Sequence, residues 1–158
     1  MYKFIENLHE EYKIDLLDIQ AFEKKFDVKF PPEMVNFYLQ YNSAEIYPSR
    51  IEVGKDSFQV IAFCPIRYNR YPYLFTVEDA MIQNRKNSFI DSKMIQYAVN
   101  SNKKPYSFDV KNLYLCDSTS GEVYLTTKDD ITNPIKICDS FNEFLSRLSV
   151  CDGDDGDI

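Results

Sequence analysis

Glycine and histidine are both scarce in this chain, and their scarcity limits the chemistry open to it. The 158 residues include four glycines and one histidine. Neither GxGxxG nor GxxxxGK[ST] occurs, so the sequence offers no glycine-rich phosphate-binding loop. A Ser-His-Asp triad would have to use His9, and no GxSxG motif is present. We expect His9 to be a solvated surface residue, because no second histidine or cysteine near it in the sequence completes a metal site.

The cysteines form no recognisable motif. Cys64, Cys116, Cys138 and Cys151 are spaced unlike any zinc site or redox pair. Three of them lie in apolar runs, where cysteine behaves as a small hydrophobic residue. We therefore expect reduced, mostly buried thiols, as is typical of a cytoplasmic protein.

Long apolar runs are also absent. No run approaches the ~20 apolar residues that a membrane span requires. Residues 1–13 include Glu6, Glu10 and Glu11 and lack a continuous apolar segment, so we expect no signal peptide and no membrane partner. The expected location is the cytoplasm.

The composition is that of a folded, acidic chain. Hydrophobic residues make up 44% and aromatic residues 15% of it, which excludes a disordered chain. The length suits one domain, expected over residues 1–150, followed by an acidic, disordered tail over 151–158. The net charge of −7 disfavours a general nucleic-acid binder, since phosphate contacts need a basic face, and it favours a basic protein partner.

Residues 19–42 predict two amphipathic helices joined by a short turn. Ile19, Phe22 and Phe26 fall at helical spacing, and Asp15 is a suitable N-cap with Asp18 three residues on. A second apolar stripe follows Pro31 and Pro32, which suit a first helical turn; its members are Met34, Phe37, Tyr38 and Tyr41. We expect Asn42 to end this helix in the left-handed conformation.

The remaining pattern predicts an α+β protein. We expect a first helix over 2–12, another over 76–84 and a last helix that Ser140 caps. Strands are expected at 50–53, 58–64, 95–100, 106–109, 112–116, 122–126 and 135–138. Short connections between them imply a meandering antiparallel or mixed sheet, covered by the N-terminal helices and the C-terminal helix. The expected core residues are Phe22, Phe26, Phe37, Phe141 and Phe144.

The order of these motifs resembles the SUKH superfamily, which includes the Smi/Knr-like regulators of yeast cell-wall assembly. The matching residues are Ile19, Phe22, Glu23, Phe30, Pro31, Phe37, Leu39, Tyr41 and Asn42, then Gly121, Val123 and Tyr124, and finally Phe141, Phe144, Leu145 and Leu148. The resemblance covers residues 14–148. Ser43 and Ala44 depart from it, because the family usually has glycine after the YN pair.

The resemblance implies a non-enzymatic protein-binding module with a SUKH-like fold. Bacterial members are similar to immunity proteins encoded beside polymorphic toxins, many of them nucleases, and fungal members act through protein contacts. Our hypothesis is a bacterial immunity protein that neutralises a toxin by direct binding, with no catalytic residue, cofactor or metal. The alternatives are a metal-dependent hydrolase that uses Asp and Glu, and a scaffolding or regulatory domain of the cell-wall-assembly type. The oligomeric state stays open.

Residues 67–73 are the stretch that the fold does not explain. They contain two arginines and three tyrosines in a predicted loop, and these residue types are enriched at interface hot spots. We predict that Arg67, Tyr68, Arg70 and Tyr71 contact the partner, while Asp129 and Asp130 steer it at long range. There are two alternatives. The loop packs its tyrosines on the sheet edge, or it stacks on single-stranded nucleic acid.

Overall fold

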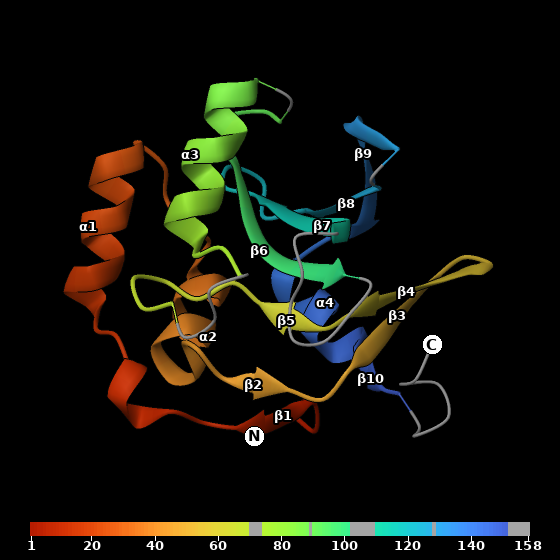
Figure 1. The fold of residues 1–158 in the computed structure, drawn as a ribbon, viewed down its shortest axis with the longest axis horizontal. Helices are drawn as coiled ribbons and strands as arrows, with labels where there is room; N and C mark the ends of the chain where they lie inside the picture. The colour runs from red at the N-terminus through yellow and green to blue at the C-terminus, as the bar shows by residue number, and fades with distance from the viewer. Residues whose placement is uncertain (70–73, 89, 102–109, 128, 152–158) are drawn as a thin grey trace.

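The predicted helical pair is present as α1 (Leu16–Phe26) and α2 (Pro32–Tyr41). The computed structural model describes residues 1–69, 74–88, 90–101, 110–127 and 129–151 (Figure 1). Asp15 caps α1 as expected: its Oδ1 accepts from the Asp18 N–H at 3.0 Å, and Asp18 Oδ2 accepts from the Asp15 N–H at 3.0 Å. This reciprocal pair satisfies two backbone donors at the start of the helix.

The described strands form three antiparallel sheets. A five-stranded meander has the order β5-β6-β7-β8-β9, a second sheet has the order β10-β3-β4, and β1 pairs with β2. The strand bounds are β1 Ile5–Asn7, β2 Glu45–Ile46, β3 Ser49–Val53, β4 Asp56–Val60, β5 Ala62–Phe63, β6 Met94–Ser101, β7 Val110–Asp117, β8 Val123–Thr127, β9 Asp130–Cys138 and β10 Ser149–Val150. The architecture is α+β, as the sequence predicts.

Aromatic side chains join the helices to the large sheet. The two other helices are α3 (Val77–Asn87) and α4 (Phe141–Arg147). Phe141 of α4 lies 5.5 Å from Phe37 of α2 and 5.1 Å from Tyr97 of β6, between ring centroids. Phe144 lies 5.2 Å from Tyr97 and 5.6 Å from Tyr114. The five phenylalanines expected in the core are all buried, which confirms their placement.

The helix predicted over residues 2–12 is wrong. The chain forms β1 there, then a 3₁₀ helix over Glu10–Tyr12. The spacing of apolar residues is helical, but Phe4 and Ile5 are both buried while Leu8 is exposed. Pairing of β1 with β2, together with the stacking of Phe4 on Phe63 at 5.9 Å, overrides the local pattern.

The strand predicted over residues 58–64 is two strands in two sheets. β4 pairs with β3, and after Ile61 the chain turns so that β5 pairs with β6. An alternating pattern does not show which sheet a strand joins, so this change could not be predicted from the residues alone. The turn and strand expected over 102–109 and the tail after 151 lie outside the described residues.

The predicted backbone conformation of Asn42 is also wrong. Asn42 has φ −56° and ψ 132°, and the following residue, Ser43, takes the left-handed conformation with φ 60°. The reason lies in the Asn42 side chain, which is buried and makes hydrogen bonds to segments distant in sequence. These bonds hold the residue in an extended conformation.

Candidate partner-binding surface

The segment before Arg67 is fixed to the rest of the fold by Asn42. Asn42 Nδ2 donates to the Tyr12 carbonyl and to the Ile66 carbonyl, each at 2.9 Å. Asn42 Oδ1 accepts from the Ile66 N–H at 2.8 Å. One buried amide therefore links the 3₁₀ helix, the end of α2 and the start of the predicted partner loop.

Arg67 lies between the first turns of α1 and α3. Its backbone N–H donates to both carboxylate oxygens of Glu78, at 2.9 and 3.1 Å, and its Nη1 donates to Asp18 Oδ1 at 2.5 Å. Its φ of 69° is unusual for a residue with a side chain, so these contacts hold a strained backbone in place. The side chain is nevertheless 57% exposed.

The two carboxyl groups beside Arg67 have pKa values shifted in opposite directions. Burial raises the pKa of Glu78. The Asp15 backbone bond and, after it, the Arg67 guanidinium lower the pKa of Asp18. Arg67 thus joins α1 to α3 through one carboxyl group on each helix.

Tyr68 packs under Arg67. The guanidinium carbon of Arg67 lies 5.1 Å from the centroid of the Tyr68 ring, and the Tyr68 ring lies 5.9 Å from that of Tyr12. Ser43 Oγ donates to the Tyr68 carbonyl at 3.2 Å. This half of the predicted loop is therefore a fixed stack of arginine and two tyrosines that stays partly exposed.

Two exposed leucines lie in the first turn of α1, next in sequence to Asp18, which pairs with Arg67. Leu16 and Leu17 are 49% and 72% exposed, and they lie between Asp15 and Asp18, the two residues of the capping box. We call Tyr12, Leu16, Leu17, Arg67 and Tyr68 the Tyr68 surface. The sequence prediction missed both leucines. Leu17 lies outside the buried stripe of Ile19, Phe22 and Phe26. Its position in the sequence could therefore have indicated an exposed apolar side chain.

The predicted steering residues lie elsewhere. Asp129 and Asp130 are exposed where β8 turns into β9, and Figure 1 shows β8 and β9 on the opposite side of the molecule from α1. Asp130 Oδ1 accepts from Asn133 Nδ2 at 2.8 Å. The fold therefore does not bring these aspartates next to Arg67 and Tyr68. Arg70 and Tyr71 lie outside the described residues.

The titratable groups offer little for catalysis in the described part of the chain. No three His, Cys, Asp or Glu side chains there are placed to hold a metal ion. His9 is less solvated than expected, because its Nε2 lies 2.8 Å from Glu45 Oε1. Burial raises the pKa of Cys64 and of Cys116 to about 12 each, so neither thiol ionises readily. Among the helices described, none is long and apolar enough to span a membrane.

Comparison with known families agrees with this architecture. The model of the SMI1 / KNR4 family (SUKH-1) matches residues 13–147, and the chain belongs to that family. Its members are known generally as non-enzymatic immunity proteins of polymorphic toxin systems. A comparison with curated proteins finds no match.

Proposed function

We propose that this protein is a bacterial immunity protein that neutralises a toxin by direct binding, with no chemistry of its own. Its membership of the SUKH-1 family is the observation that carries the proposal. The net charge of −7 favours a basic toxin domain, and a nuclease with a positive cleft has that character. The protein acts in the cytoplasm, as one domain over residues 1–150.

The Tyr68 surface is the proposed centre of contact. It combines one arginine, two tyrosines and two exposed leucines, and large side chains of these kinds supply the buried anchors of protein interfaces. Its backbone is already fixed by Asn42 and Glu78, so little conformational entropy is lost on binding. Arg70 and Tyr71 continue this surface in the proposal.

Acidic residues around the Tyr68 surface suit a basic partner. Glu10 and Glu11 lie in the 3₁₀ helix beside Tyr12, and Asp15 and Asp18 flank the leucines. Lys13 and Arg67 offset part of this charge, since Lys13 Nζ lies 3.9 Å from Glu10 Oε2. Asp129 and Asp130 act at a distance, by attracting the partner rather than touching it.

Neutralisation in living cells tests the proposal. Bacteria that express the toxin encoded beside this gene should grow only when the protein is co-expressed. The Leu17→Asp and Tyr68→Ala variants should lose protection while remaining folded by circular dichroism. Ile135→Asp is the matched control, because Ile135 is 54% exposed on β9, away from the Tyr68 surface. Failure of the unaltered protein to protect would overturn the function, and full protection by both variants would overturn the surface.

The metal-dependent hydrolase and the cell-wall scaffold are the competing functions. No group among the described residues favours the hydrolase. A thermal melt with magnesium, manganese or calcium distinguishes the hydrolase from the immunity protein, because an organised metal site raises the melting temperature when its metal binds. A scaffold would bind a protein partner yet give no protection against a toxin.

A further inference from the structure

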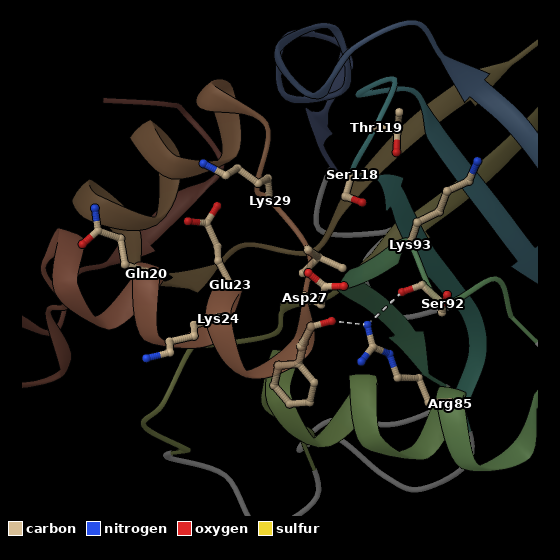
Figure 2. A pocket seen from close by; sticks show the side chains of 12 residues that line it. Gln20, Glu23, Lys24, Asp27, Lys29, Arg85, Ser92, Lys93, Ser118 and Thr119 are labelled. Atoms are coloured by element: carbon tan, nitrogen blue, oxygen red, sulfur yellow. Dashed lines mark hydrogen bonds between the residues drawn. The ribbon is translucent and has the colours of Figure 1, made fainter.

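A recess of about 900 Å³ lies at the opposite end of α1 from the Tyr68 surface (Figure 2). Four segments line it: the C-terminal half of α1 with the loop after it, α3, the residues before β6 and the turn after β7. α1 has 11 residues and so spans about 16 Å, and most of the α1 residues that line the recess lie toward its C-terminal end, although Gln20 in its second turn also lines it. A volume of this size is within the range of small-molecule sites.

Arg85 is the fixed cation of the recess. Its Nη2 donates to the Phe26 carbonyl and, at 3.2 Å, to the Ser92 carbonyl. Its guanidinium carbon lies 5.6 Å from the centroid of the Phe26 ring. Among the described residues, no carboxylate pairs with Arg85, and its buried Nε has no hydrogen-bond partner. The guanidinium is therefore held in place by neutral groups and keeps its charge, but its unpartnered Nε is itself buried, so a ligand in the recess would meet the Nη groups.

Lysines and hydroxyl groups line the recess around Arg85. Lys24 and Lys29 come from α1 and its following loop and Lys93 from the other side, and in Figure 2 the ammonium groups of all three point outward, away from the Arg85 guanidinium. Ser92, Ser118 and Thr119 add hydroxyl groups. The Ser118 N–H donates to the Lys93 carbonyl at 3.0 Å, which ties the turn after β7 to the segment before β6.

The recess is positive in an acidic molecule. Its lining has four cations, Lys24, Lys29, Arg85 and Lys93, against two carboxylates, Glu23 and Asp27. Lys93 Nζ also lies 3.7 Å from Asp117 Oδ2, so a carboxylate outside the lining offsets part of its charge. Glu23 Oε2 accepts from the Phe30 N–H at 2.7 Å, so one of its carboxylate oxygens already has a hydrogen-bond partner within the fold. Basic residues at the ends of α1 and α3 complement the helix dipoles, but that role does not require both helix ends to meet over one recess.

We propose that this recess binds a phosphate-bearing small molecule. A planar arginine matches the oxygens of a phosphoryl group, hydroxyl groups add neutral donors, and flexible lysines neutralise the remaining charge. Phe26 and Val28 supply an apolar wall for the rest of the ligand. The shared feature is the phosphoryl group, whether it comes from a nucleotide or from a free polyphosphate. This site is separate from the proposed toxin-binding surface and does not depend on it.

Calorimetric titration of the purified protein tests the site with inorganic phosphate, pyrophosphate and ADP at low ionic strength. We expect saturable binding of pyrophosphate or ADP. If ADP binds and pyrophosphate does not, the recess is a nucleotide site. If pyrophosphate and ADP bind with equal affinity, it is a polyphosphate site. Arg85→Gln should weaken binding roughly tenfold or more, because it removes charge-assisted hydrogen bonds.

Two lysines keep the test decisive if Arg85→Gln fails to fold. Lys29 makes no ion pair among the described residues, so Lys29→Gln should leave the fold intact and weaken binding several-fold. Lys111, exposed on β7 and outside the recess, is the matched control, and Lys111→Gln should bind like the unaltered protein. The proposal is overturned if none of the three ligands binds, or if Lys29→Gln and Lys111→Gln behave alike.

Discussion

At the scale of single residues, Asn42 shows how one buried side chain can organise a surface. The chain after α2 bends at Ser43, and Asn42 uses its amide to hold the Tyr12 and Ile66 backbones. Asn42 therefore stabilises this region through the hydrogen bonds of its side chain, and not through the left-handed backbone conformation predicted for it. The Arg67 segment depends on it, because Ile66 directly precedes Arg67.

Replacing Asn42 with alanine should destabilise the protein by about 2–4 kcal/mol. The change leaves buried backbone groups at Ile66 and Tyr12 without partners, and each costs about 1–3 kcal/mol. Urea denaturation measures the effect. Asn36→Ala is the control, since Asn36 is exposed on the same helix. If the two variants were equally stable, Asn42 would have no structural role.

The ion pairs of Lys136 should give a stability term that depends on pH. Lys136 Nζ lies 2.6 Å from Glu122 Oε2 and 2.8 Å from Asp139 Oδ1. Lys136 lowers the pKa of both carboxyl groups, and they raise its own pKa. Carboxylates with a lowered pKa stabilise the fold above their ordinary pKa and lose this contribution as the pH falls.

Lys136→Gln should therefore be less stable than the unaltered protein from about pH 5 to 8, and the difference should shrink as the pH falls below about 4. Urea denaturation at several pH values measures it. High salt should also reduce the difference, because these groups are solvent-exposed. A difference that stayed constant from pH 7 to pH 3 would show that Lys136 stabilises by packing alone.

At the scale of elements, α1, α3 and α4 were predictable because their N-terminal ends carry local signals, whereas the wrongly predicted helix over residues 2–12 was inferred from apolar spacing alone. Asp15, Thr76 and Ser140 each accept a backbone hydrogen bond from the residue three positions on. The cap of α4 differs from the predicted capping box in one bond. Glu143 Oε2 accepts from the Asp139 N–H instead of from the Ser140 N–H. The short strands β1, β2 and β10 were missed because they depend on partners distant in sequence, which no local pattern records.

The candidate surface was predictable only in part, for a related reason. Arg67 and Tyr68 stood out by residue type, but Tyr12, which contacts Tyr68, comes from a segment some 50 residues earlier in the chain, as do Leu16 and Leu17. The contact of Arg67 with Asp18 that joins these segments is tertiary. Composition could indicate that residues 67–73 bind a partner. Only the fold shows which residues distant in sequence lie next to Arg67 and Tyr68.

Helix α4 should be essential to the core through Phe141. Its ring contacts α2 and β6, and its side chain is fully buried. Phe141→Ala should cost about 3–5 kcal/mol in the free energy of unfolding, through lost burial and a residual cavity. Ile82→Ala on α3, where the side chain is 49% exposed, should change it by less than about 0.5 kcal/mol. Equal losses would mean that α4 does not pack as described.

At the scale of the whole molecule, charge is distributed unevenly. Acidic residues gather around the N-terminal turn of α1, and the cationic recess lies at the other end of that helix. The β8–β9 turn adds Asp129 and Asp130 on another side. In the proposed function, the overall field attracts a basic partner, and the Tyr68 surface sets its final position.

These two roles should separate in the kinetics of toxin binding. Tyr68→Ala and Leu17→Asp remove anchors, so each should raise the dissociation rate by an amount worth about 2 kcal/mol or more, with little change in association. Asp129→Asn with Asp130→Asn removes distant charge, so it should slow association at low salt and leave dissociation unchanged. Surface plasmon resonance against the immobilised toxin domain measures both rates. At about 0.5 M salt the aspartate variant should associate like the unaltered protein, because screening removes long-range attraction. The assignment of anchors fails if the tyrosine and leucine variants dissociate normally. The assignment of steering fails if the aspartate variant dissociates faster at every salt concentration, since that would place Asp129 and Asp130 within the contact itself.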